Sequence, residues 1–408
     1  MASSALKEPL SKKGHTPFLV KGEVKPVIIL AIILATRLLG LFMIYPVFTP
    51  YAQTLPGATP VLVGLALGIY GLTQGALQIP LGALSDRWGR KAIIIAGLVL
   101  FGVGSVVAAL SSSLWGIIIG RFIQGMGAIG SVVLALVADV TRDEARTYAM
   151  AIIGMTIGAS FMVAIGIGPL LAAFIGVPGI FWLIALLALV DVILTMYALP
   201  ASSRPTAAPA RLLPSLARLG RNGNLLRLDY SIFTLHAVLT ASFLIIPALL
   251  TEAFHLHPFQ TEIFYLPTFG AALIFMGPLV VIAERKKRMG EVILFSLVLF
   301  FTSLALLLGA GTNKILIALA LVLFFTVFTT MEALLPSLVT KTAPPEMRGT
   351  ATGIYSSAQF LGIFFGGAFG GAAATWGGGH AVFILALSMA ALWFLFAPRA
   401  VPRHSTAN

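Results

Sequence analysis

Residues 82–91 read Gly-Ala-Leu-Ser-Asp-Arg-Trp-Gly-Arg-Lys, a short basic segment between two long apolar stretches. The pattern returns 198 positions later, where Pro80, Asp86, Arg87 and Arg90 are matched by Pro278, Glu284, Arg285 and Arg288. Two halves of an apolar chain that share a turn motif indicate duplication. Duplicated helical bundles are the architecture of secondary transporters, so this segment predicts the fold and suggests a function.

The composition indicates a protein that lies in lipid. The chain is 59% hydrophobic and only 10% charged, with a mean hydropathy of +1.01. These charges are too few to cover the surface of a soluble domain. Twelve apolar runs each have roughly the 20 residues that cross a bilayer as a helix. They lie at about 27–50, 60–82, 92–110, 114–138, 148–172, 178–199, 227–251, 262–283, 291–310, 314–339, 350–375 and 379–398.

The distribution of positive charge predicts the orientation. Of the 26 Lys and Arg, 23 fall in the N-terminus, the C-terminus or the loops that follow even-numbered spans. Arg37 and Arg121 lie inside spans, which leaves Lys314 alone on the far side. By the positive-inside rule both termini are cytoplasmic, and Met1–Lys25 lacks the apolar core of a signal peptide. The net charge of +12 therefore orients a multi-pass protein of the bacterial inner membrane, and we expect no nucleic-acid partner.

Two further matches support the duplication. Phe42–Pro46 in the first span matches Phe243–Pro247 in the seventh, at an offset of 201. After spans 4 and 10, at an offset of 202, Val137, Glu144 and Arg146 match Val339, Glu346 and Arg348. We expect an all-α membrane protein with twelve transmembrane helices, in two six-helix halves related by pseudo-two-fold symmetry. The predicted divisions are a cytoplasmic segment 1–26, a bundle 27–199, a linker 200–226, a bundle 227–398 and a tail 399–408.

Small residues and a basic linker add local expectations. Glycines repeat at helix-packing spacing in spans 2, 5 and 11, which predicts close backbone contact along a sliding interface between the halves. They are Gly64, Gly68, Gly71 and Gly75, then Gly154 and Gly158, then Gly362, Gly366 and Gly370. In the linker, Arg211–Leu219 suits either a basic amphipathic helix on the inner leaflet or a solvated segment.

These motifs resemble those of the major facilitator superfamily, over essentially all twelve spans. Gly82–Lys91 is similar to the family's signature loop between spans 2 and 3, and Arg121 with Gln124–Gly127 resembles its span-4 arginine motif. Gly166, Gly168 and Pro169 resemble a span-5 motif of drug–proton antiporters, although Leu170–Ala172 replaces the downstream glycine pair. The resemblance implies the major facilitator fold and proton-coupled antiport.

Three segments are closer still to the YajR-type bacterial efflux proteins of that superfamily. They are Arg37–Met43 with Pro46, Met331–Val339, and Gly349–Gly362. Members of this type carry a small soluble domain after span 12. The sequence ends at Asn408, about ten residues past its last span, so we expect this chain to resemble them without that domain.

Ionisable residues at membrane depth are costly and are the first candidates for function. Arg37 and Arg121 stay charged, so each can attract an anion or organise the cavity but cannot carry the coupling proton. Glu332 in span 10 is the first candidate for proton coupling, with Asp191 and His236 as alternatives. Each of these groups also has a purely structural reading, as an inter-helix hydrogen bond or ion pair.

The leading hypothesis is a secondary transporter that works by alternating access and exports small amphipathic or hydrophobic compounds in exchange for protons. Uncharged polar and aromatic residues inside the spans are candidates for the cavity wall: Tyr45, Tyr70, Gln74, Gln78, Gln124, Tyr355 and Gln359. A cytoplasmic gate is expected from Gly82, Asp86, Arg87, Gly89, Arg90, Asp139, Gly349 and Thr350. In it, Asp86 approaches Gly349–Thr350 and Arg87 or Arg90 pairs with Asp139, contacts expected only when the cytoplasmic mouth is closed.

The sequence offers no site for catalysis. It has no Cys, no phosphate-binding Gly-Lys-Ser/Thr loop and no His/acid metal cluster, so we expect neither an enzyme nor a metal or other cofactor. The expected partners are a small-molecule substrate, protons and lipid, with the chain acting as a monomer. Two alternatives stay open. One is a metabolite or anion exporter or importer of the same fold, and the other is a non-transporting membrane sensor or assembly factor.

Overall fold

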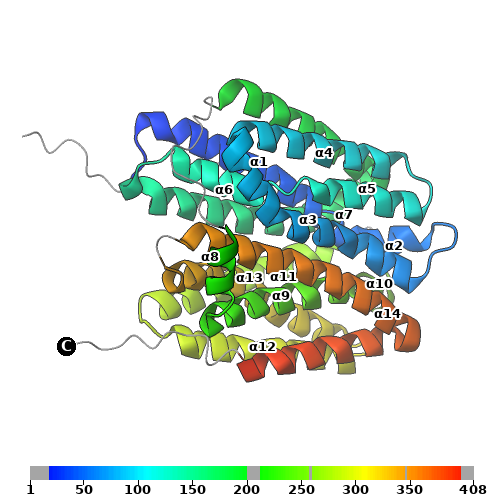
Figure 1. Cartoon of the computed structure of the whole chain (residues 1–408). Helices are drawn as coiled ribbons and strands as arrows, with labels where there is room; N and C mark the ends of the chain where they lie inside the picture. The colour runs from blue at the N-terminus through cyan, green and yellow to red at the C-terminus, as the bar shows by residue number, and fades with distance from the viewer. Residues whose placement is uncertain (1–17, 200–211, 257–259, 345–346, 397–408) are drawn as a thin grey trace, which may run out of the picture.

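The computed structural model describes residues 18–199, 212–256, 260–344 and 347–396, and within them the regular structure is helical (Figure 1). Its N-terminal helices are α1 (Lys21–Phe42), α2 (Tyr45–Gln53), α3 (Pro60–Trp88), α4 (Arg90–Leu110), α5 (Leu114–Met126), α6 (Gly130–Asp139) and α7 (Asp143–Ala198). After α8 (Leu212–Leu219) come α9 (Gly223–Phe243), α10 (Ile246–Phe254), α11 (Glu262–Glu284), α12 (Met289–Gly309), α13 (Lys314–Thr342) and α14 (Arg348–Phe396).

The helices account for the predicted spans. Among the described residues nine helical stretches are long and apolar enough to cross a membrane, and a tenth is the pair α9 and α10, bent by 41°. Two of the nine, in α7 and α14, run for 55 and 49 residues, about twice what a bilayer requires. Their backbones leave the helical conformation at Gly176 and at Gly377–Gly378. With each of these counted as two, the twelve-span all-α fold is confirmed.

The repeated sequence produces a repeated break in the helix. Span 1 is interrupted between α1 and α2 at Met43–Ile44, and span 7 between α9 and α10 at Leu244–Ile245. The matched prolines, Pro46 and Pro247, are the second residue of the second helix in each pair. Proline lacks the backbone N–H and clashes with the preceding turn, so it favours a new helix start.

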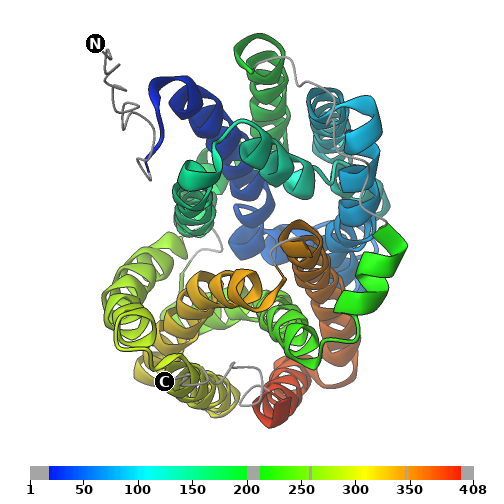
Figure 2. The ribbon, with the colours of Figure 1, turned by 60° about the vertical axis from the view of Figure 1, so that its left-hand side comes forward.

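The helices form two groups that correspond to the two halves of the sequence, with the N-terminal half above the C-terminal half in Figures 1 and 2. The most extensive contact between the groups is between α3 and α14. The predicted segments 1–26 and 200–226 are described only from Phe18 and from α8 onward, and 399–408 lies outside the described residues. The helix α8 packs against α14, with Leu219 buried.

The contact between α3 and α14 widens along its length. A side chain at Gly64, Gly68 or Gly71 would collide with the α14 backbone. Further along α3, a Cβ at Gly75 would lie 3.0 Å from the carbonyl oxygen of Ser357, and one at Gly353 would lie 3.7 Å from Ile79. At Gly349 nothing lies within 4 Å. The halves therefore touch at one end of this interface and separate toward the other.

The glycine expectations need two corrections. Gly362, Gly366 and Gly370 pack against the backbone of α9, inside the C-terminal half, because the opposite side of α14 faces α3. A Cβ at Gly154 or Gly158 would meet nothing within 4 Å, so these two glycines make no close helix contact in this conformation. Their part of α7 lines open space instead.

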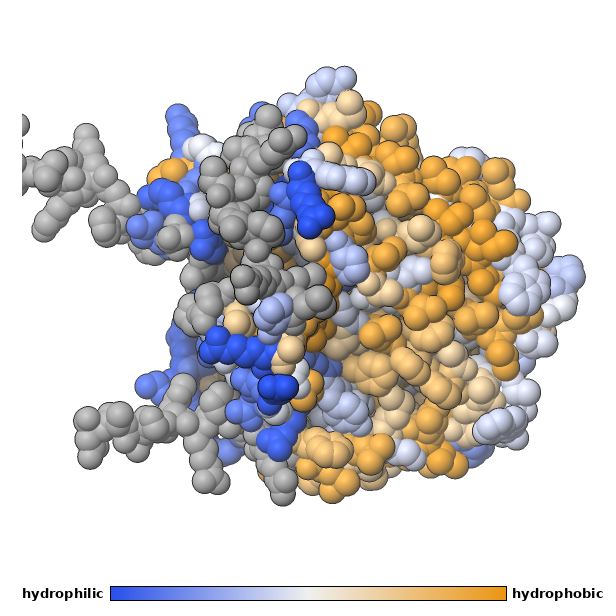
Figure 3. Space-filling model, viewed as in Figure 1, coloured by the Kyte–Doolittle hydropathy of each residue, from blue (hydrophilic) through white to orange (hydrophobic). Residues whose placement is uncertain are grey.

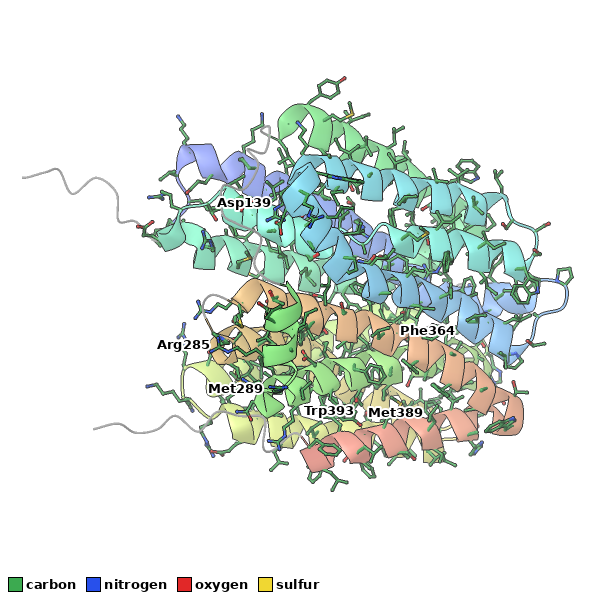
Figure 4. The ribbon with its side chains drawn as sticks, in the orientation of Figure 1. Asp139, Arg285, Met289, Phe364, Met389 and Trp393 are labelled. Carbon is green, nitrogen blue, oxygen red and sulfur yellow. The ribbon has the colours of Figure 1, made fainter. Side chains whose placement is uncertain are left out.

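The surface agrees with a membrane protein. Large apolar side chains are exposed along the bundle, among them Phe174, Ile274 and Leu395, and they form a broad hydrophobic surface (Figure 3). Hydrophilic residues gather at one end of the molecule in the same view. Asp139 and Arg285, which come from different halves, both lie at this end (Figure 4). We call it the basic end, defined by Arg87, Arg90, Arg146, Lys341 and Arg348.

Candidate functional site

A cavity of about 2020 Å³ lies between the two halves and extends to the basic end. Its wall comes from α3, α6 and α7 on one side and from α11, α13 and α14 on the other. Near the mouth it is lined by cations of both halves, including Arg87 and Lys341. The deeper wall is mainly apolar and includes Phe161, Met162 and Phe328.

The opposite end of the molecule is closed by contacts between the halves. The hydroxyl of Tyr45 lies 3.2 Å from that of Thr240, and Thr49 donates to the carbonyl of Phe243 at 3.3 Å. The ring of Tyr45 also meets Phe243 edge-on, 5.6 Å between centroids, and is fully buried. Tyr45, expected in the cavity wall, therefore belongs to this closed end. As far as the described residues show, the cavity opens at the basic end.

Glu332 is the one acid in the deeper wall among the described residues, since Asp86, the other acid of the lining, lies at the mouth. Its Oε1 lies 3.6 Å from Nε2 of His236 and makes no hydrogen bond. His236 Nδ1 lies 3.3 Å from the carbonyl oxygen of Ile232, which requires a proton on Nδ1. Nε2 then accepts from the Gln359 amide at 2.9 Å, so the network assigns a neutral imidazole and leaves Glu332 without a cation.

Asp191, another candidate for proton coupling, is separate from this group. It is 1% exposed, accepts a hydrogen bond from Thr36, and lies outside the residues that line the cavity. Of the three coupling candidates the structure brings together Glu332 and His236. It places Asp191 between α1 and α7 of the N-terminal half.

The two buried arginines have different surroundings. Arg121 donates to the carbonyl oxygens of Ala66 at 3.3 Å and Leu67 at 3.2 Å. It lines neither the main cavity nor the smaller pocket described below. Its neighbour Gln124 donates to Ser105 of α4 at 2.7 Å. Neither residue faces the cavity, contrary to the expectation, because this face of α5 packs onto α3 and α4.

The other expected cavity residues do line open space. Gln78, Tyr355 and Gln359 belong to the main wall, and the hydroxyl of Tyr355 is buried without a hydrogen-bond partner. Arg37, Tyr70 and Gln74 line a smaller pocket of about 80 Å³. Gln78, Ser356 and Gln359 border both spaces, so the smaller one is a side pocket of the cavity.

The gate motif is an ion-pair cluster within the N-terminal half. Arg90 lies 2.5 Å from Asp86 and donates from Nε to Asp139 at 3.2 Å. It also contacts Ser85, a residue that the sequence analysis missed. Gly89 (φ 90°) makes the turn from α3 into α4, a conformation that favours glycine.

Two expectations about this gate need correction. The Arg90–Asp139 pair is present, but it forms while the mouth is open, because both residues belong to the same half. Asp86 forms an ion pair with Arg90, whereas Gly349 and Thr350 lie elsewhere on the cavity wall. Contact between Asp86 and the start of α14 would therefore require the halves to approach.

The C-terminal half carries a related cluster with altered charges. Glu284, the match of Asp86, binds Lys341 at 2.6 Å and accepts from Ser337 at 2.9 Å. Lys341 occupies the position that Asp139 holds in the first half, at the offset of 202. The repeat offset relates this pair to the first half, but the residue types do not indicate it, because the charge at the second position is reversed.

The span-5 motif lies at the closed end. A side chain at Gly166 would collide with Leu266 of α11, and one at Gly168 with the carbonyl of Met43. Both glycines thus allow α7 to pack closely against neighbouring helices. About one to four turns before Gly166, Met150, Gly154, Gly158 and Met162 recur every fourth residue and line the cavity. The sequence analysis named only the two glycines of this stripe, and it placed them at a sliding contact rather than on a cavity wall.

Comparison with known proteins agrees with this geometry. Residues 30–367 match the model of the Major Facilitator Superfamily. The chain belongs to this superfamily. It is 40% identical to the inner membrane transport protein YajR of Escherichia coli (strain K12), over 90% of this chain and 81% of that protein. It is 27% identical to the class G tetracycline resistance protein of Vibrio anguillarum, over 86% and 92%.

Solved structures show the same fold. A bacterial homolog of the human lysosomal transporter Spinster, in an inward-facing and occupied conformation, matches with a TM-score of 0.74 at 13% identity. The match covers 94% of this chain and 98% of that one. The chain is thus a major facilitator transporter, a multi-pass membrane protein that acts on a small molecule. The predicted resemblance to YajR-type proteins is confirmed.

Proposed function

We propose that this protein exports small amphipathic or hydrophobic compounds across the bacterial inner membrane in exchange for protons, by alternating access. The observation that carries the proposal is Glu332, an acid without a cation partner in the deeper wall of a cavity that is open at one end. A carboxyl group whose access to water changes with conformation can bind a proton on one side and release it on the other. Aqueous access to Glu332 now runs through the basic end.

The proposed orientation in the membrane rests on the placement of positive charge. We propose that the basic end and both termini are cytoplasmic, by the positive-inside rule, so that this conformation is inward-facing. The two bundles 27–199 and 227–398 would then rock about the contact at the far end. Since one chain encloses the whole cavity, we propose that the monomer is the functional unit.

The residue types in the cavity wall support an amphipathic substrate. Methionine and phenylalanine side chains such as Met162, Met276 and Phe328 adapt to irregular apolar shapes, and glutamines supply a few uncharged polar groups. Such a surface is unsuited to sugars or polyanions, which need many fixed hydrogen bonds. The similarity to a tetracycline resistance protein and to YajR supports export of this kind of compound.

Flux in proteoliposomes tests the proposal. We expect a panel of amphipathic solutes that includes tetracycline to contain at least one whose movement is driven by an imposed pH gradient. Solute flux that does not depend on the pH gradient would refute proton coupling but would remain consistent with alternating access. No movement of any solute under any gradient would instead favour a sensor or assembly role.

A further inference from the structure

Arg37 carries hydrogen-bond donors that the protein leaves unused. The residue is 4% exposed, and of its five N–H donors only those on Nη2 are used, for Tyr70 at 3.3 Å and Gln74 at 3.1 Å. Nε is buried and has no partner. Arg121 differs, since its Nε, Nη1 and Nη2 all donate, to Ala66, Gln124 and Leu67.

The charge of Arg37 also lacks a direct partner. Among the described residues no carboxylate lies within 4.0 Å of its guanidinium, and its flat face lies over Phe101 at 5.2 Å. Asp191 attracts Arg37 electrostatically but forms no ion pair with it. The Asp191 carboxylate instead accepts a hydrogen bond from Thr36. A buried cation with free donors is costly, so this position favours the arrival of an anion.

The space beside Arg37 fits a small charged group. The side pocket holds about 80 Å³ and is continuous with the main cavity past Gln78, Ser356 and Gln359. A water molecule occupies roughly 10–15 Å³ of pocket volume measured in this way. The side pocket therefore has room for a carboxylate or sulfonate group but not for the apolar body of a ligand. The apolar remainder of a ligand would have to stay in the main cavity, beside Ile157, which borders both spaces.

We propose that Arg37 and this side pocket form an anion subsite of the transport cavity. It binds the single negatively charged head of an amphipathic substrate, while the apolar body lies against the wall around Phe161 and Phe328. The inference rests on the proposed transport function and narrows its substrate class to amphipaths with one acidic group. Arg37 would bind the head through paired N–H donors, a geometry that guanidinium offers and ammonium does not.

Three matched probes test the subsite on the full chain in nanodiscs by calorimetry, without any gradient. They share one ring system: naphthalene-2-sulfonate, naphthalene-2-sulfonamide and the 2-naphthyltrimethylammonium cation. We expect the wild-type protein to bind the sulfonate about tenfold to a hundredfold more tightly than the neutral sulfonamide. Arg37→Gln should remove this preference and leave sulfonamide binding within about twofold. Arg37→Lys should restore it in part.

Two further variants sharpen the test. Lys341→Gln, which removes a cation from the cavity mouth, should keep the sulfonate preference, because that ammonium is 50% exposed and binds Glu284. Ser356→Glu should abolish it by placing a carboxylate in the side pocket, and serves if Arg37→Gln does not fold. The subsite is refuted if the sulfonate preference survives in Arg37→Gln or Ser356→Glu, or if wild type prefers the cation.

This experiment separates the subsite from the proposed transport function. A sulfonate preference that depends on Arg37, without flux in proteoliposomes, would support the subsite and refute transport. Proton-driven flux without that preference would refute the subsite alone.

Discussion

His236 and Glu332 lie 3.6 Å apart, yet the hydrogen bonds of the imidazole go to Ile232 and Gln359. The histidine is therefore held neutral beside an acid that faces the cavity. This arrangement differs from a buried ion pair, in which each charge fixes the other. It leaves the carboxyl group without a fixed counter-charge, as the proposed proton coupling requires.

The first prediction concerns this carboxyl group. Glu332→Gln should abolish pH-driven flux in proteoliposomes, by at least about tenfold, because an amide cannot carry the proton. Probe binding should persist, since the substitution conserves the shape of the wall. Asp191→Asn is the comparison and should retain pH-driven flux, because Asp191 does not line the cavity. The opposite ranking of the two variants would transfer the coupling role to Asp191.

The second prediction concerns Arg121. Its donors satisfy carbonyl oxygens of α3, so Arg121→Ala should lower the stability of the protein rather than its selectivity. We expect a loss of about 1.5–3 kcal/mol for each charged hydrogen bond removed, measured as a lower denaturation midpoint. Arg121→Lys should recover only part of it, because a point charge cannot replace the planar fork. A variant with normal stability but altered probe preference would contradict this structural role.

The third prediction compares two glycines. A side chain at Gly71 would collide with the carbonyl of Phe360, whereas one at Gly154 would meet nothing within 4 Å. Gly71→Ala should therefore lower the melting temperature, and Gly154→Ala should leave it unchanged or raise it slightly, because alanine favours an unobstructed helix position over glycine. In proteoliposomes, Gly154→Leu should reduce flux without loss of stability, because in the proposed alternating-access cycle its part of α7 approaches the other half when the mouth closes. Equal destabilisation by both alanine variants would show that α7 already packs there.

The fold could be predicted from sequence because it depends on patterns that survive without coordinates. Apolar runs of bilayer length predicted the spans, and the repeat centred on Phe42 and Phe243 predicted matched halves. Helix bends could be anticipated at Pro46 and Pro247, although the sequence does not give their angle. The two backbone breaks, at Gly176 in α7 and at Gly377–Gly378 in α14, lie between predicted spans. The apolar runs predicted the ends of those spans correctly.

The site was only partly predictable, because membership of a cavity depends on the rotation of each helix. Arg37 and Arg121 look equivalent in the sequence, and only the structure shows that one is satisfied by α3 carbonyls while the other faces a pocket. Likewise Tyr45 and Tyr355 are both buried tyrosines in apolar spans, but Tyr45 closes the far end and Tyr355 lines the cavity. The conformational state also decides which contacts exist.

The last prediction concerns the gate. Asp86 is bound to Arg90 while the mouth is open, and the helix dipole and backbone amides at the start of α14 would attract it when the halves close. That attraction is worth about 0.3–1 kcal/mol at an exposed site, which shifts the conformational equilibrium roughly twofold to fivefold. Asp86→Asn should therefore favour the open mouth and reduce flux.

The absence of Cys makes this shift measurable. Thr340 is exposed and lines the cavity, so a single thiol introduced by Thr340→Cys reports access from the basic end. We expect Asp86→Asn to raise its labelling rate about twofold to fivefold. Glu284→Gln is the matched control and should leave the labelling rate unchanged. It removes the equivalent acid of the other half, which binds Lys341 at 2.6 Å. Unchanged labelling in Asp86→Asn, with normal insertion, would mean that the loop only orients the chain and does not stabilise the closed mouth.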